Sequence, residues 1–131
     1  MFKVIMLIKK KPGMTREEFM DYYDNKHIPL MHRILSKGAA IHRRNYVIPS
    51  ASDIASPDNL DARAENDYDV ICEVFYEDLE TAQSVMRDFQ NEEVRRLTEE
   101  DEGKFQLRGS IKRYIVEVHE TVFRALPQAG I

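Results

Sequence analysis

The sequence predicts an α+β domain of the ferredoxin-like type, in which helices pack against one face of a four-stranded antiparallel sheet. Its 131 residues suit a single domain with its own core. Its composition, 43% hydrophobic and 32% charged, is that of a globular protein. Strand-like and helix-like segments follow one another in the order β-α-β, β-α-β, the split order of this fold. We expect one domain over residues 1–124, followed by a loose tail at 125–131.

The first half of the chain predicts a strand, a long interrupted helix and a second strand. Residues 1–9 are rich in β-forming side chains and apolar at both parities, as in a strand covered on both faces. Thr15 with a glutamate three residues later forms a capping box, so a helix begins there. Pro29 cannot donate a backbone hydrogen bond, so we expect the helix to kink or restart near His27 and then continue to a stop at Gly38.

The second half predicts the same order of elements after a long polar segment. Residues 49–67 are rich in Pro, Ser, Asp and Asn, which indicates a loop long enough to suggest function or disorder. Asp78 can cap a helix whose apolar residues recur every three or four positions. The other expected elements are strands at 41–48, 68–76 and 110–122, a short helix at 92–98 and a solvated acidic loop at 99–102.

The first and third strands are apolar on both faces, which predicts that a second copy of the chain covers the sheet face that the helices leave free. Two helices cover only one sheet face, and a large exposed apolar face promotes aggregation. Symmetric self-pairing is the commonest assembly. We therefore expect a homodimer that closes a dimeric α+β barrel around a pocket for a small-molecule ligand.

The charge pattern and the cysteine count exclude several classes of protein. The net charge of −4 and the single lysine run at 9–11 disfavour nucleic acid as a partner. The longest apolar stretch, at 4–8, is too short for a membrane span or a signal peptide, so we expect a cytoplasmic protein with no membrane partner. Cys72 is the only cysteine, and no metal-ligand spacing or phosphate-binding loop occurs, so no cofactor or metal is expected.

The run YYDNKHIPL contains the first candidate site. Tyr23 and His27 are four residues apart and share one helix face. Histidine is suited to moving a proton near neutral pH, and a phenol beside it can orient a substrate or stabilise an oxyanion. Both are candidate catalytic residues. The alternative is that His27 only bonds a backbone carbonyl freed by Pro29.

Polar side chains on the second and fourth strands form a second candidate set. His42, Arg44 and Tyr46 share one parity of the second strand, and Arg113 lies on the fourth. Polar groups on a covered sheet face need partners or a solvated pocket. They are candidates for binding an anionic or phenolic substrate, with Arg44 or Arg113 holding a carboxylate. The alternative is that they form ion pairs at the dimer interface or face water at a sheet edge.

Three segments, KPGMTREEFMDYYDNKHIPL, FYEDLETAQ and DEGKF, resemble the EthD family of dimeric α+β barrels. The resemblance covers nearly the whole chain, and its most specific part is the helix end. Leu107 and Arg108 depart from the family, which often has an acidic residue after the phenylalanine. The positions that carry the resemblance are Tyr23, His27, Pro29, Leu30, Asp101, Glu102 and Phe105.

The resemblance implies small-molecule chemistry of catabolic or secondary metabolism. Similar proteins include lyases, dehydratases and isomerases, in which the histidine matching His27 is the usual candidate for proton transfer. Some related monooxygenases rely on a tryptophan in the pocket, which this chain lacks. We expect cofactor-independent proton transfer on a small cyclic or aromatic oxygenated compound. A noncatalytic small-molecule-binding or accessory protein and a cofactor-independent oxidoreductase stay open as alternatives.

Overall fold

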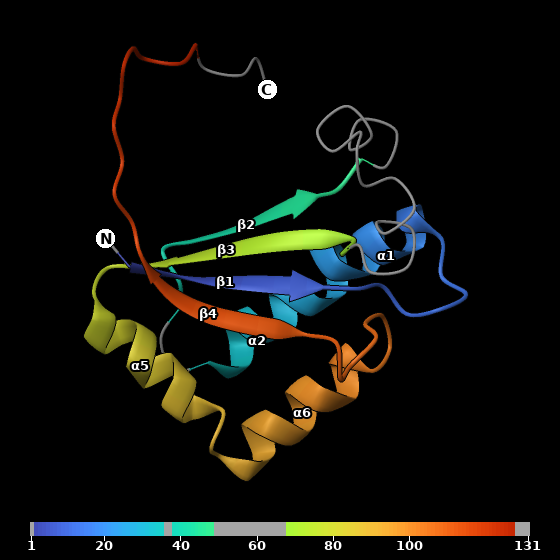
Figure 1. Cartoon of the computed structure of the whole chain (residues 1–131). Coiled ribbons are helices and arrows are strands. Elements are labelled where there is room, and N and C mark those ends of the chain that lie inside the picture. The colour runs from blue at the N-terminus through green and yellow to red at the C-terminus, as the bar shows by residue number, and fades with distance from the viewer. Residues whose placement is uncertain (1, 36–37, 49–67, 128–131) are drawn as a thin grey trace.

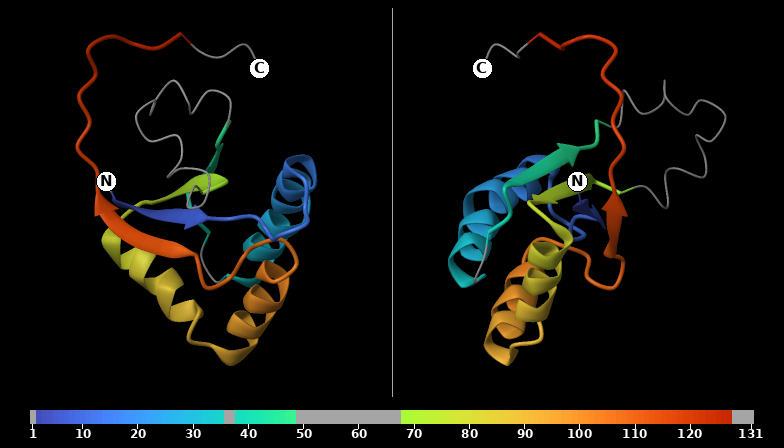
Figure 2. Two further views of the ribbon diagram at one scale, coloured as in Figure 1. Left: turned by 45° about the vertical axis from the view of Figure 1, so that its right-hand side comes forward. Right: turned by 90° about the vertical axis from the view of Figure 1, so that its left-hand side faces the viewer.

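The computed structural model describes residues 2–35, 38–48 and 68–127 and confirms the α+β, ferredoxin-like fold (Figure 1). Its four strands form one antiparallel sheet in the order β2-β3-β1-β4. Figure 2 shows all the helices on one side of this sheet. The elements in chain order are β1 (Phe2–Ile8), α1 (Arg16–Tyr22), η1 (Tyr23–His27), α2 (Ile28–Ile34), β2 (Ile41–Tyr46), β3 (Val70–Tyr76), α5 (Leu79–Asp88), α6 (Glu92–Glu102) and β4 (Lys112–Glu117).

The first helical segment begins as predicted and changes to a π-helical turn at the expected interruption. The Thr15 hydroxyl accepts from the Glu18 N–H at 3.1 Å, and the Glu18 carboxylate accepts from the Thr15 N–H, also at 3.1 Å. At the expected kink, η1 is a π-helical turn in which the Ile28 N–H donates to the Tyr23 carbonyl. The helix therefore widens by one residue before Pro29 and does not break, because the wider turn re-pairs the backbone around a residue without an N–H.

The same segment ends earlier than predicted. The stop expected at Gly38 is wrong, because α2 ends at Ile34 and Leu35 is already extended. The extended backbone packs the Leu35 side chain against a core cluster on the helix side of the sheet. Packing of one apolar side chain thus overrides the local signal for a later stop.

The acidic run at 99–102 is the second correction. It is not a solvated loop but the last turn of α6, and Asp101 and Glu102 are buried, with 8% and 4% exposure. Asn91 caps the helix by accepting from two backbone N–H groups, and Arg96 pairs with glutamates on the same helix. These local bonds, together with distant partners for the two buried carboxylates, extend the helix through the run.

The two faces of the sheet differ in what covers them. Alternate residues such as Val4, Ile8 and Val74 are buried under the helices. The opposite face carries Ile71 and Tyr114, which are 39% and 51% exposed. No described helix lies over this second face (Figure 2).

The remaining boundaries affect the site little. Strands β2, β3 and β4 are each shorter than the expected segments. The expected loop at 49–67 lies outside the described residues, as do residues 128–131. Residues 125–127 of the expected tail are exposed. Within the described ranges, no helix has both the length and the apolar character needed to cross a membrane.

Candidate functional site

A cavity of about 150 Å³ lies between the sheet and the helices. Residues of all four strands form its floor, with α2 on one side and α5 and α6 on the other (Figure 2). Its walls are mostly apolar, for example Met31, Leu35 and Phe89. Its polar lining residues are His27, His32, His42, Thr98, Glu102 and Arg113.

His27 belongs to a hydrogen-bonded chain of three polar residues, of which His27 and Asp101 are buried. The His27 Nδ1 lies 2.7 Å from Oδ2 of Asp101, and the other oxygen of that carboxylate accepts from the Tyr22 hydroxyl at 2.6 Å. The three side chains come from the end of η1, the last turn of α6 and the end of α1. The π turn and the unexpected last turn of α6 therefore bring together residues 74 positions apart.

The electrostatics of this chain leave a basic nitrogen at the cavity wall. Burial lowers the pKa of His27, and the nearby charge of Arg113 lowers it too, while Asp101 opposes both. A lowered pKa favours the neutral ring at pH 7, and a proton on Nδ1 allows that nitrogen to donate to the carboxylate. No described residue bonds Nε2. Its lone pair is free to accept a proton from a ligand in the cavity.

Tyr22 holds the carboxylate from the other side. Burial and the adjacent Asp101 raise the pKa of Tyr22 to about 12. It therefore remains a phenol at all ordinary pH values and donates its proton to Asp101. With two donors on one carboxylate, the orientation of the His27 ring is fixed.

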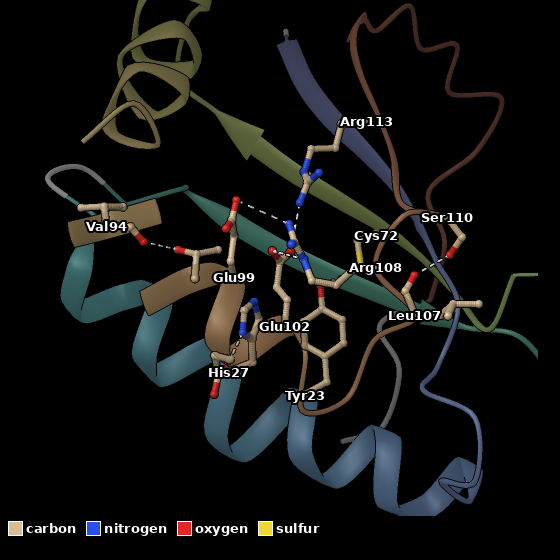
Figure 3. A network of polar contacts seen from close by, with 12 residues as sticks. Tyr23, His27, Cys72, Val94, Glu99, Glu102, Leu107, Arg108, Ser110 and Arg113 are labelled. Carbon is tan, nitrogen blue, oxygen red and sulfur yellow. Dashed lines mark hydrogen bonds and ion pairs between the residues drawn. The ribbon is translucent and has the colours of Figure 1, made fainter. Parts of the chain in front are cut away.

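Tyr23 lies beside His27, as its spacing predicts, but its hydroxyl contacts other residues. It is 1% exposed, and its hydroxyl lies 3.1 Å from Sγ of Cys72 and 3.3 Å from Nε2 of His42. It does not line the cavity. Its ring packs edge-on against His27 with centroids 5.5 Å apart. Tyr23 therefore contacts both His27 and His42, which line the cavity, without lining it itself. Figure 3 shows Tyr23 near His27 and Cys72.

The predicted substrate-binding set divides into two pairs. His42 and Arg113 line the cavity. Burial is the main cause that lowers the pKa of His42 to about 4, so this ring is also neutral at pH 7. Arg44 and Tyr46 are not in the lining and meet instead at Asp24, whose Oδ1 lies 2.6 Å from the Arg44 Nε and 2.7 Å from the Tyr46 hydroxyl. Arg44 thus forms an ion pair, and Tyr46 a hydrogen bond, with a carboxylate of the same chain.

Sequence reasoning gave no role in the site to Tyr22, Asp101 or Glu102, and it expected the two carboxylates in a solvated loop. The available signal was the helical spacing of Val94, Thr98 and Asp101, which continues the buried side of α6 into the acidic run. The family motif also included both carboxylates. Among the residues that the structure describes, no group of three or more His, Cys, Asp and Glu side chains is arranged to hold a metal ion.

The comparisons with known proteins agree on one family. The model of the EthD domain matches residues 11–106. The fold resembles the crystal structure of an ethyl tert-butyl ether D (EthD) family protein from Bacillus halodurans, with a TM-score of 0.58 and 22% identity, over 91% of this chain and 99% of that chain. No protein of curated function matches the sequence significantly. The family model spans most of the chain, and the chain therefore belongs to the EthD family.

Proposed function

We propose that this protein is an enzyme that catalyses cofactor-independent proton transfer, with His27 as the general base. The observation that carries the proposal is the Tyr22–Asp101–His27 chain, which ends in an unbonded Nε2 at the wall of a mostly apolar cavity. Paired histidine and carboxylate groups of this kind fix the tautomer of the ring and stabilise the imidazolium that forms. A histidine with only a packing role needs neither a carboxylate partner nor an unbonded Nε2 at a cavity wall.

The geometry supports a two-step use of one proton. Nε2 takes a proton from a C–H or O–H group of the ligand, and Asp101 stabilises the resulting imidazolium. The same nitrogen then returns the proton to a different atom, which gives an isomerase, or to a departing group, which gives a dehydratase or lyase. General acid/base catalysis of this kind contributes roughly 100- to 10,000-fold to a rate.

The size and lining of the cavity support a small cyclic or aromatic oxygenated substrate. An engineered apolar cavity of about 150 Å³ in another protein takes up benzene. The cavity here has a similar volume and apolar walls, so a single ring fits beside His27. Oxygen substituents of that ring would meet the polar groups of His42 and Arg113.

A noncatalytic binding protein is the second candidate, and the apolar share of the walls favours it. One experiment separates the two. Native mass spectrometry identifies the compound that the purified protein retains, and that compound is then incubated with fresh protein and followed by NMR. Conversion to a new compound supports the enzyme, whereas an unchanged compound supports the carrier.

We also propose that the chain works as a homodimer built on the uncovered sheet face. This face exposes Ile71 and Tyr114 beside an ion pair of Lys3 and Glu73 with an N–O distance of 2.6 Å. Covering such a surface removes apolar area from water. Static light scattering at micromolar concentration is expected to give twice the chain mass.

The matched variants for the dimer are Ile71→Glu and Glu80→Gln. Ile71→Glu places a charge in the proposed interface and is expected to halve the measured mass, because a buried unpaired charge is costly. Glu80→Gln, on the helix layer, is expected to leave the mass unchanged. A wild-type protein that stays monomeric at high micromolar concentration would contradict the proposed assembly.

A further inference from the structure

A second hollow, of about 240 Å³, adjoins the cavity that contains His27. The two share five lining residues, among them Glu102 and Arg113, so these two side chains stand on the wall between them. Three arginines from different segments line the hollow. Arg95 comes from α6, Arg108 from the turn after it and Arg113 from β4.

The charges around this hollow are not balanced. Glu102 forms ion pairs with Arg113 and Arg108, with N–O distances of 3.0 Å and 3.6 Å. Glu99 pairs with Arg108 at an N–O distance of 3.8 Å. Arg95 forms no ion pair with any residue of the described ranges. Among the residues that line the hollow, three guanidinium groups therefore face two carboxylates. The further carboxylate that acts on Glu102, that of Asp101, is outside the lining and is bonded to His27 and Tyr22.

The exposure of these groups shows which of them a ligand meets. The side chain of Glu102 is 6% exposed, whereas those of Arg108 and Arg113 are 43% and 45% exposed. Figure 3 shows both arginines converging on Glu102, with His27 beside it. The buried Glu102 carboxylate thus orients the guanidinium groups of Arg108 and Arg113. Each guanidinium carries five N–H donors, so some of these donors stay available to a ligand.

We infer that this hollow, defined here as the arginine subsite, binds a carboxylate of the substrate, so that the substrate is a small cyclic carboxylic acid. Its ring lies in the cavity beside His27 and its carboxylate meets Arg95, Arg108 and Arg113. Guanidinium groups match carboxylates in geometry and bind them with charge-assisted hydrogen bonds. The identification of the ligand as a substrate rests on the proposed function, while the binding of the anion does not.

The test compares benzoate with benzamide, which has nearly the same shape and no charge. Isothermal titration calorimetry on the wild-type protein is expected to show benzoate binding roughly 10- to 100-fold more tightly than benzamide, the range of a charge-assisted contact. Arg113→Gln and Arg95→Gln are each expected to reduce this preference at least about threefold. Arg95→Gln leaves no buried carboxylate unpaired, so this variant can test the arginine subsite even if Arg113→Gln fails to fold.

Two further variants complete the design. Arg96→Gln removes the same charge one position away, where the side chain pairs with Glu93 and Glu100 outside the hollow, and is expected to keep the preference. His27→Gln is also expected to keep it, so loss of the proton-transfer role is distinguishable from loss of the anion site. Equal affinity for benzoate and benzamide in the wild-type protein, or an undiminished preference in Arg95→Gln, would overturn the inference.

Discussion

Replacing His27 with glutamine is expected to lower turnover of the retained compound by roughly 100-fold or more, the usual scale for loss of a general acid or base. Glutamine can still donate a hydrogen bond to Asp101, so the fold and the dimer are expected to survive with a nearly unchanged melting temperature. The variant removes the titratable Nε2 and little else. Parallel measurements of kcat and of thermal unfolding check both halves of the prediction.

His32→Gln is the matched control, because His32 also lines the cavity and lies on the following helix. Among the residues that the structure describes, no buried carboxylate bonds His32, so its replacement is expected to change turnover only a few-fold. If His27 only satisfied a structural hydrogen bond, His27→Gln would instead cost about 1 kcal/mol of stability and leave ligand turnover intact. That pattern would contradict the catalytic assignment.

Asp101→Asn is expected to lower turnover about as much as His27→Gln does, although Asp101 does not line the cavity. Asparagine cannot carry the negative charge that stabilises the imidazolium, and it has one acceptor oxygen where the carboxylate offers two. In serine proteases the equivalent change lowers kcat by about 10,000-fold. We expect a loss of roughly 100-fold or more here, with a lower pKa of His27, because the Asp101 charge raises that pKa.

Tyr22→Phe is the control for Asp101→Asn. It removes one of the two donors to the carboxylate but keeps its charge and its bond to His27. The expected cost is about 1 kcal/mol of stability and a much smaller loss of turnover. If Asp101→Asn kept wild-type kcat, Asp101 would be a structural partner of His27 and no more.

Local chemistry made part of the fold predictable. The Thr15 capping box and the Asp78 cap depend on side chains and amides within three residues, and both form as expected. The apolar pattern of β1 and β3 likewise follows from strand periodicity. These features need no knowledge of the rest of the chain.

The parts that sequence reasoning missed depend on distant partners. A carboxylate such as Asp101 is buried only because His27 and Tyr22, more than 70 residues away, satisfy it. Spacing alone suggested Tyr23 as the companion of His27, but the π turn directs its hydroxyl to Cys72 and His42. The pairing of Arg44 with Asp24 is similarly a product of tertiary structure.

The protonation state of the His27 ring tests the central claim most directly and needs no substrate. Long-range ¹H–¹⁵N NMR spectra report which ring nitrogen carries the proton, and a titration from pH 5 to 8 gives the pKa. We expect a neutral ring at pH 7, protonated at Nδ1 and bare at Nε2, with a pKa below the ordinary 6.5. A ring that is protonated at both nitrogens at pH 7, or that carries its single proton on Nε2, would contradict it.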